Sequence, residues 1–354
     1  MQRIGHRSYL SARRGLFWLP HQFIRITVRF RLGRRAWLRA ATLPSFILLR
    51  KELIRLRVFP DTVTASLDTL GVRGRPIKML VGSPWDQVAA QIWADGAGAY
   101  EQPVSGLVAA LGRTSKRALV VGANTGFYCI LLALEPNRPQ VDAVEPWAPA
   151  VERLRQNLEL NNVTDSVVVW PVAAGPNDGK MILRVPPPLS EDWPFETSAS
   201  LSATYKFHHE HEIEVPVTTI NAIRQSRSTP IDLIIVDAEG FDHEVLKGAE
   251  HTVASDRPII FTEVSPSEQD SLNALLERWG YVTVELEPSG LTLRDRIVRP
   301  ARTMGPIPDS GEGDAEWWIS VMLPPSRFSD LAAAAAECSL PLRNASKFVA
   351  PYNI

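Results

Sequence analysis

Acidic side chains stand at the ends of three short apolar runs in this chain. They are Glu145, Asp237 and Glu263. Short apolar runs bounded by turn residues are typical of strands buried in a sheet. If these strands are parallel, their carboxyl ends meet at the edge where α/β sheets bind ligands. Carboxylates grouped there raise each other's proton affinity, so the pattern predicts base catalysis at this edge.

A fourth apolar run, Ala118–Val121, ends at glycines instead of an acid. Gly122 and Gly126 enclose a turn, and a helical pattern follows over 127–134. Glycine lets the backbone come close to a ligand where a strand ends. The dinucleotide pattern G-x-G-x-x-G is absent, because Asn124 stands at the position of its second glycine. This argues against a pyrophosphate lying on this turn.

Glu145 comes about 20 residues after these glycines, where α/β nucleotide sites place an acid on the ribose hydroxyls. A carboxylate that accepts two hydroxyl hydrogen bonds is a strong orienting contact. We therefore expect Glu145 to bind a ribose. The alternative is a solvated acid at the end of a strand.

Four segments, in this order, resemble the FkbM-type family of S-adenosylmethionine-dependent methyltransferases. They are Val-Gly-Ala-Asn-Thr-Gly at 121–126, Val-Glu-Pro at 144–146, Leu-Arg-Gln-Asn-Leu-Glu-Leu-Asn at 154–161, and Val-Asp-Ala-Glu-Gly with Val-Leu-Lys-Gly-Ala at 236–249. The resemblance covers roughly residues 98–285. It implies a class I methyltransferase fold with seven strands, the last of them antiparallel. The family usually carries Asp where Val120 stands, Lys where Ile235 stands, and often Glu where Asp242 stands.

The resemblance also implies the residues of the site. The positions expected to bind the cofactor are Tyr100, Glu101, Gly122, Ala123, Asn124, Gly126, Glu145, Pro146 and Ala173. Asp237 is the first choice for the base that takes the proton of the acceptor, followed by Glu239 and Glu263. Two alternatives stay open for these acids. Together they suit Mg²⁺, and Asp237 alone suits the cap of a following helix.

Residues 186–211 form a long segment without clear periodicity. Such a segment inside a compact domain predicts a flap on the substrate side, with a plain surface excursion as the alternative. It contains His208, His209 and His211, which are alternative bases because histidine titrates near neutral pH. These histidines stand too close together in the sequence to predict a metal site.

The order of apolar runs and helical patterns predicts an α/β protein with a doubly wound, Rossmann-like, mostly parallel sheet. The expected parts are a basic amphipathic helical extension at 1–60, a methyltransferase domain at 61–325, and a C-terminal helix and tail at 326–354. Three local expectations are a turn at Gly71–Pro76, one helix over 242–254, and a loop at 288–314.

Charge is unevenly distributed along the chain. Residues 1–60 hold 14 Arg and Lys and one acid, whereas the remainder has a net charge of −14. Helical patterns at 21–39 and from Ser45 onward combine Arg with Phe and Trp, which predicts peripheral membrane contact through 21–57. Packing on the domain itself, packing in an oligomer, and a targeting segment are the alternatives.

Composition narrows the setting. The absence of an 18-residue apolar window argues against a transmembrane helix. Only Cys129 and Cys338 are present, so a disulfide framework is excluded and a cytoplasmic protein is expected. The inner face of a membrane is the alternative location.

The predicted function is S-adenosylmethionine-dependent O-methylation of a hydroxyl on a sugar, glycolipid or polyketide-type acceptor. The acceptor would be a small molecule or a lipid-linked sugar. We expect no nucleic-acid partner, because the part outside the basic extension is acidic. The motif Asn/Asp-Pro-Pro-Tyr/Phe, which is typical of methyltransferases that act on exocyclic amines, is absent. A catalytically inactive cofactor-fold protein that serves as a binding or scaffold partner stays open, as does another acceptor class.

Overall fold

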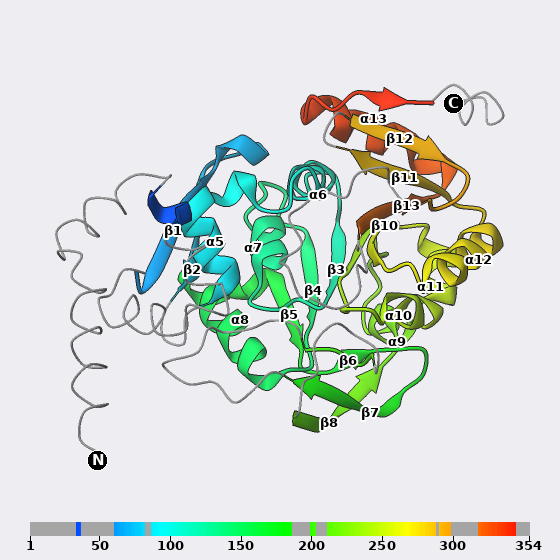
Figure 1. Ribbon diagram of the computed structural model, residues 1–354, viewed down its shortest axis with the longest axis horizontal. Helices are drawn as coiled ribbons and strands as arrows, with labels where there is room; N and C mark the ends of the chain where they lie inside the picture. Colours follow the sequence, from blue (N-terminus) through cyan, green and yellow to red (C-terminus); the bar gives the residue numbers. More distant parts are fainter. Residues whose placement is uncertain are drawn as a thin grey trace, which may run out of the picture.

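The computed structural model describes residues 33–36, 60–81, 86–185, 199–202, 211–287, 290–298 and 318–344. Within these residues the main sheet has nine strands in the order β14-β12-β11-β13-β10-β9-β3-β4-β5 (Figure 1). Their bounds are β3 (Arg117–Val121), β4 (Gln140–Val144), β5 (Val167–Trp170), β9 (Leu233–Val236), β10 (Ile259–Val264), β11 (Val282–Glu287), β12 (Gly290–Arg294), β13 (Trp318–Leu323) and β14 (Leu342–Arg343).

The central part of this sheet is parallel, as predicted. Strands β5, β4, β3, β9 and β10 pair parallel in that order. Strand β13 lies antiparallel between β10 and β11. The α/β fold class is therefore confirmed, but the count of seven strands is not, because β12 and β14 extend the sheet beyond β11.

The loop predicted at 288–314 is wrong for the residues of β12. Leu291 and Leu293 are 0% and 1% exposed, and β12 pairs antiparallel with β11. Burial of these leucines against the sheet outweighs the turn-forming character of the surrounding Pro and Gly residues.

Helices cover both faces of the sheet. One face carries α6 (Val104–Gly112), α7 (Phe127–Ala133), α8 (Ala148–Leu160) and α13 (Phe328–Glu337). The other carries α9 (Ile220–Gln225), α10 (Asp242–Lys247), α11 (Glu250–Asp256) and α12 (Gln269–Trp279). In β3, Ala118 and Val120 belong to the first core, whereas Leu119 and Val121 belong to the second. Burial on both faces explains why this strand shows no polar alternation.

The single helix predicted over 242–254 is wrong. The chain forms α10 and α11 instead, with Gly248 between them. A Cβ atom at Gly248 would lie 2.1 Å from the carbonyl oxygen of Gly175, so this backbone packs directly on another. The carbonyl of Gly248 accepts a hydrogen bond of 3.0 Å from the Asn221 amide instead of continuing the helix.

An antiparallel hairpin and a helix precede the main sheet. They are β1 (Thr62–Leu67), β2 (Val72–Leu80) and α5 (Gln87–Asp95). Short strands are predicted over 61–97, so the helix α5 differs from that expectation. The predicted turn at Gly71–Pro76 is wrong, because the chain turns over Asp68–Leu70 and Gly71 and Pro76 lies inside β2. Proline is tolerated there because, among the described residues, β2 has β1 on one side and no strand on the other. The short 3₁₀ turns are η2 (Asp68–Leu70), η3 (Ala97–Ala99), η4 (Thr164–Ser166) and η5 (Pro325–Arg327).

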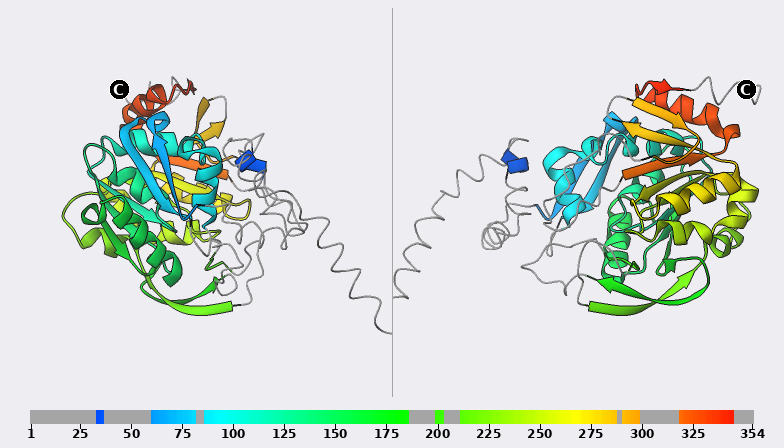
Figure 2. Two further views of the ribbon diagram at one scale, coloured as in Figure 1. Left: turned by 90° about the vertical axis from the view of Figure 1, so that its left-hand side faces the viewer. Right: turned by 45° about the vertical axis from the view of Figure 1, so that its right-hand side comes forward.

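A small second sheet lies at the side of the domain opposite α13 and β12 (Figures 1 and 2). It contains β6 (Ala173–Ala174), β7 (Gly179–Val185) and β8 (His211–Thr218) in the order β6-β8-β7. Its inner face packs Leu183 and Val215 against Trp147, which follows β4. This sheet therefore brings residues far along the chain next to the end of β4.

Most of the basic extension lies outside the described residues, as do His208 and His209. Of the extension, the helical residues 33–36 are described. Arg34 Nη1 donates a hydrogen bond of 3.1 Å to the Trp93 carbonyl, and Arg35 forms an ion pair with Asp95. These residues thus contact α5. In the described parts of the chain, none of the helices is long and apolar enough to traverse a bilayer.

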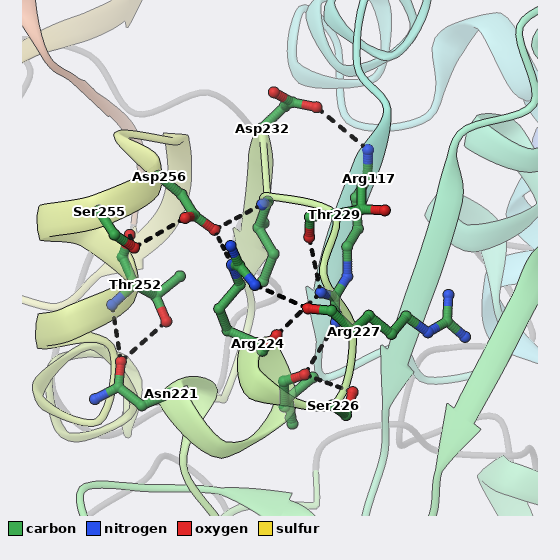
Figure 3. Close-up of polar contacts among 12 residues, drawn as sticks. Arg117, Asn221, Arg224, Ser226, Arg227, Thr229, Asp232, Thr252, Ser255 and Asp256 are labelled. Atoms are coloured by element: carbon green, nitrogen blue, oxygen red, sulfur yellow. Dashed lines mark hydrogen bonds and ion pairs between the residues drawn. The ribbon is translucent and has the colours of Figure 1, made fainter.

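Buried charges at the amino-terminal ends of the strands are paired (Figure 3). The Arg117 side chain is fully buried, and its Nε donates to Asp142 at 2.7 Å. Its remaining nitrogens donate to backbone carbonyls, including that of Thr229 at 3.0 Å. Nearby, Arg224 pairs with Asp256, and Asp256 also accepts the Ile231 amide at 2.8 Å. These contacts join the starts of β3, β4 and β9.

Candidate active site

A cleft opens at the carboxyl ends of β3, β4 and β9. Its empty volume, which includes space open to solvent, is about 610 Å³. Its walls combine apolar side chains with three carboxylates. The lining residues are Val121, Gly122, Asn124, Val144, Glu145, Pro146, Trp147, Ala150, Ala173, Ala174, Leu183, Ala199, Leu201, Asp237, Ala238 and Glu239.

Glu145 lies at the end of β4 and is only 6% exposed. One carboxylate oxygen accepts the Trp147 amide and the other accepts the Asn124 amide, each at 2.9 Å. Burial raises the pKa of Glu145 to about 7, although these hydrogen bonds oppose the rise. The two bonds fix the carboxylate between the loops after β3 and β4, and each oxygen keeps capacity to accept a further donor.

Gly122 allows the turn after β3 to pack closely against the backbone at the end of β9. Its φ is +72°, and a Cβ atom there would lie 1.9 Å from the Asp237 carbonyl oxygen. The Gly122 and Ala123 amides both donate to the Val144 carbonyl at 3.0 Å. A side chain at position 122 would therefore push the end of β9 away from the turn and widen the cleft.

A second cavity adjoins the cleft at Asp237. Its empty volume is about 380 Å³. Its lining residues are Glu101, Val104, Tyr128, Ile235, Val236, Asp237, Phe261, Glu263 and Ile319. Asp237 lines both cavities, so a ligand in one could meet a ligand in the other beside this carboxylate.

The electrostatics of Asp237 favour proton uptake near neutral pH. Desolvation by the surrounding protein raises its pKa to about 7, and repulsion from Glu101 and Glu145 makes a smaller contribution to this rise. The side chain is nevertheless exposed to the open cleft, and water there offsets part of this rise. A ligand that expels the water would strengthen it. Burial also raises the pKa of Glu101, which accepts the Tyr128 hydroxyl at 2.5 Å.

Asp237, Glu239 and Glu263 form an acid cluster in which one carboxylate oxygen from each residue lies within 4.8 Å of the others. Glu239 has a φ of +50°, a left-handed conformation that few residues other than glycine adopt. Backbone geometry of this kind collects at functional sites. The loop after β9 thus turns sharply enough to bring Glu239 back beside Asp237.

Asp242 holds this loop to the neighbouring strand. It is fully buried and accepts the Ala238 amide at 3.2 Å. Its other oxygen accepts the Thr262 hydroxyl and the Glu263 amide, both at 3.1 Å. Burial, with repulsion from Asp237 and Glu268, raises the pKa of Asp242. Asp242 therefore fixes the spacing between the β9 loop and the end of β10.

The structure brings most of the predicted site residues to these two cavities. The first cavity is lined by five of the expected cofactor positions, Gly122, Asn124, Glu145, Pro146 and Ala173. Glu101 lines the second cavity, together with Glu263. Tyr100, Ala123 and Gly126 line neither. The Tyr100 ring packs on Phe127 at 4.6 Å between centroids, and Gly126 packs against Leu154.

Several lining residues were not predicted. They are Trp147, Leu183, Ala199, Leu201 and Tyr128. Trp147 directly follows Val-Glu-Pro, so its position beside Glu145 offered a signal. Leu183 reaches the cleft through the small sheet. Ala199 and Leu201 belong to the segment 186–211 that is predicted to be a substrate-side flap, most of which lies outside the described residues, and nothing in their spacing singles them out. His211, proposed as an alternative base, is exposed at the start of β8 and lines neither cavity.

The two departures from the family pattern within the sheet fall on one pair of positions. Val120 of β3 and Ile235 of β9 are partners in the register of these parallel strands. They are 2% and 4% exposed and belong to the same core. This contact between the strands is therefore apolar on both sides.

Residues 120–283 match the family model of the methyltransferase FkbM domain. Comparison with curated protein sequences gave no match. Among solved structures, the chain is similar to methyltransferase FkbM from Methylobacillus flagellatus KT, with 19% identity, a TM-score of 0.33, and coverage of 46% of this chain. The match spans only 37% of that protein's length.

Two further structures illustrate the range of similar proteins. A precorrin-6y C5,15-methyltransferase from Geobacter metallireducens GS-15 shows 14% identity, a TM-score of 0.33, and coverage of 62% of this chain and 88% of the other. The N-terminal domain of human METTL16 in complex with SAH shows 12% identity, a TM-score of 0.32, and coverage of 60% and 62%. Likeness at this level carries no conclusion about function.

Proposed function

The chain carries a methyltransferase FkbM domain, and from this premise we propose that it transfers a methyl group from S-adenosylmethionine to a hydroxyl oxygen. The observation that carries the proposal is the position of Asp237. This carboxylate lines both the cleft at the strand ends and the adjoining second cavity, so it can reach groups bound in either.

The residues of the cleft fit the cofactor. Glu145 offers a fixed carboxylate to the two ribose hydroxyls. Trp147, Leu183 and Leu201 offer apolar walls to the adenine ring. Gly122 and Asn124 lie toward the amino-acid portion, with Glu101 further along in the second cavity. When bound, S-adenosylmethionine supplies an electrophilic methyl group.

Asp237 is the proposed general base. An acceptor hydroxyl attacks more readily once its proton passes to a carboxylate, and a base works best when its pKa lies near the working pH. The pKa of Asp237, raised to about 7, meets this condition. Glu239 and Glu263 are the next candidates for the same role, since their oxygens lie in the same cluster.

Mg²⁺ is a second option for the acid cluster. Hard cations bind carboxylate oxygens, and three such groups lie within 4.8 Å of one another. If a cation bound the cluster, it would orient the acceptor oxygen and lower its proton affinity. Chelation separates the options, because a base mechanism survives removal of divalent cations.

The acceptor we favour is a small molecule or a lipid-linked sugar, with glycolipid and polyketide-type hydroxyls in the same class. Support comes from the basic extension, whose Arg and aromatic residues suit a surface of anionic lipid. The contacts of Arg34 and Arg35 with α5 would place such a surface beside the domain. We propose a cytoplasmic enzyme that contacts the inner face of a membrane through 21–57.

Calorimetry with S-adenosylmethionine and S-adenosylhomocysteine tests the first step. We expect binding of both in the micromolar range. Methyl transfer from labelled cofactor to a panel of hydroxyl acceptors then tests the reaction. Failure to bind either compound would favour a scaffold protein with a cofactor fold. Binding with methylation only of nitrogen or carbon acceptors would overturn the proposed acceptor class.

A further inference from the structure

Ser200 connects the small sheet to the acid cluster. Its side chain is 2% exposed, and its hydroxyl donates a hydrogen bond of 2.6 Å to the Glu239 carbonyl. The same hydroxyl oxygen accepts the Ser202 amide at 2.9 Å. The Ser200 backbone exchanges two hydrogen bonds with Arg184 of β7, at 2.9 and 3.0 Å. Ser200 is therefore anchored on β7 while its side chain reaches the loop after β9.

The residues on either side of Ser200 form part of the cleft wall. Ala199 and Leu201 line the same cavity as Glu145 and Asp237. One four-residue segment, 199–202, thus touches the proposed cofactor cleft and also holds the peptide of Glu239. A shift of this wall would reach Glu239 through a single short hydrogen bond.

Glu239 needs such support. Its left-handed backbone, with φ at +50°, is disfavoured for a residue with a side chain and persists only when neighbours fix it. Asp242 fixes the preceding residue through the Ala238 amide. Ser200 fixes Glu239 itself through its carbonyl. The two contacts come from opposite directions along the chain and together define the loop.

We propose that Ser200 is a positioning residue, which keeps the Glu239 carboxylate in the acid cluster and couples that cluster to the occupancy of the cleft. Its catalytic consequence rests on the proposed function, but its effect on the loop does not. A merely structural serine would lower the melting temperature and leave the loop and the cleft as they are.

The test compares Ser200→Ala and Ser200→Thr with Ser115→Ala in the full chain. Ser115 is a matched control, because it is also 2% exposed and its hydroxyl donates to a backbone carbonyl, that of Leu111, at 2.9 Å. It precedes β3 at the opposite end of the strand. The measurements are amide hydrogen exchange over 237–241, the dissociation constant of S-adenosylhomocysteine, and the melting temperature.

In Ser200→Ala we expect exchange over 237–241 to quicken, and the affinity for S-adenosylhomocysteine to fall, by about tenfold each, the usual effect of losing a buried hydrogen bond. Ser200→Thr keeps the hydroxyl and should restore both to within about threefold. Ser115→Ala should lower the melting temperature and leave both readouts unchanged.

The outcomes separate this proposal from the proposed function. Unchanged exchange and affinity in Ser200→Ala, with a lower melting temperature, would overturn the positioning role. If the wild-type protein bound no S-adenosylhomocysteine, the proposed function would fail, and the exchange comparison would still decide the role of Ser200. Faster exchange with unaltered affinity would refute the coupling between cluster and cleft.

Discussion

The two ends of the central strands differ in how their charged side chains are partnered. At the amino-terminal ends, Arg117 pairs with Asp142. Arg224 pairs there with Asp256 (Figure 3). At the carboxyl ends, five carboxylates line two cavities, and among the described lining residues none is Arg or Lys. Both regions are packed by the same strands, so the difference lies in the side chains and not in the architecture.

The pKa directions follow this contrast. Burial alone would raise the pKa of Asp256, but hydrogen bonds from Arg224 and the Ile231 amide hold it below the ordinary value. Burial raises the pKa of Glu145 to about 7, and desolvation by the surrounding protein, with repulsion from Glu101 and Glu145, does the same for Asp237; neither has an opposing basic side chain among the described residues. Paired charges indicate a structural role. Grouped carboxylates without basic partners lower the stability of the ligand-free protein, and they therefore indicate a ligand-binding site.

The largest expected effect breaks the chemistry and spares the fold. Asp237→Asn keeps the shape of the side chain and removes its basicity. Turnover should fall by about 10²–10⁴, the usual contribution of a positioned base, with kcat and kcat/KM falling together. The measurement is methyl transfer beside thermal melting. The predicted alternative of a helix cap is wrong, because α10 begins at Asp242 with Phe241 at its N-cap position. Near-normal turnover would therefore transfer the role to Glu239 or Glu263.

The next effect breaks the fold and spares the site. Arg117→Met leaves Asp142 buried without its cation, which should cost about 3–5 kcal/mol of unfolding free energy. Adding Asp142→Asn removes the stranded charge and keeps an acceptor for the Trp170 indole. The double variant should therefore regain stability in denaturant unfolding. A double variant no more stable than the single one would show that the charge is not the cause.

A smaller effect is the pH dependence of stability that Glu145, at the carboxyl end of β4, is expected to cause. The pKa of Glu145 is about 7 in the folded state against 4.5 as the ordinary value, so its contribution to stability is complete below 4.5 and is lost as pH rises through 7. The ligand-free protein should lose at most about 3 kcal/mol by this route. Glu145→Gln should remove that loss, seen as a flatter dependence of melting temperature on pH. Parallel curves for both proteins would contradict the shift.

The smallest effect concerns cofactor binding alone. Glu145→Ala should weaken S-adenosylhomocysteine binding by about 1.5–3 kcal/mol, the range for hydrogen bonds to a charged group, or roughly one to two decades in dissociation constant. Wild-type affinity should itself rise as pH passes through 7, because the ionised carboxylate is the better acceptor. An unchanged constant in the folded variant would remove Glu145 from the site.

Much of the fold was readable from local patterns. Apolar runs in the sequence predict the strands β3, β4, β9 and β10, because both faces of these strands are buried. Strand β12 and the break at Gly248 escaped prediction. The first depends on pairing with β11 and the second on contact with Gly175, and neither partner is adjacent in sequence.

The residues of the site likewise fall into those that local sequence patterns predict and those that they do not. Glu145 and Asp237 were found because strand ends converge on one edge of a sheet. Asp242 and Ser200 were not, since each acts through a backbone group of another loop. No spacing rule connects position 200 with position 239. The distance between them closes only when the small sheet folds onto the end of β4.

The register of β3 and β9 bears on how this chain diverged from the family pattern that it resembles. Val120 and Ile235 face each other in that register, where the family usually carries Asp and Lys. Restoring either charge alone would bury an unpaired ion between strands, whereas restoring both could form a pair. The two sites are thus expected to be epistatic: every stepwise route between the two states passes through a form with one unpaired buried charge, which only a simultaneous change at both positions avoids.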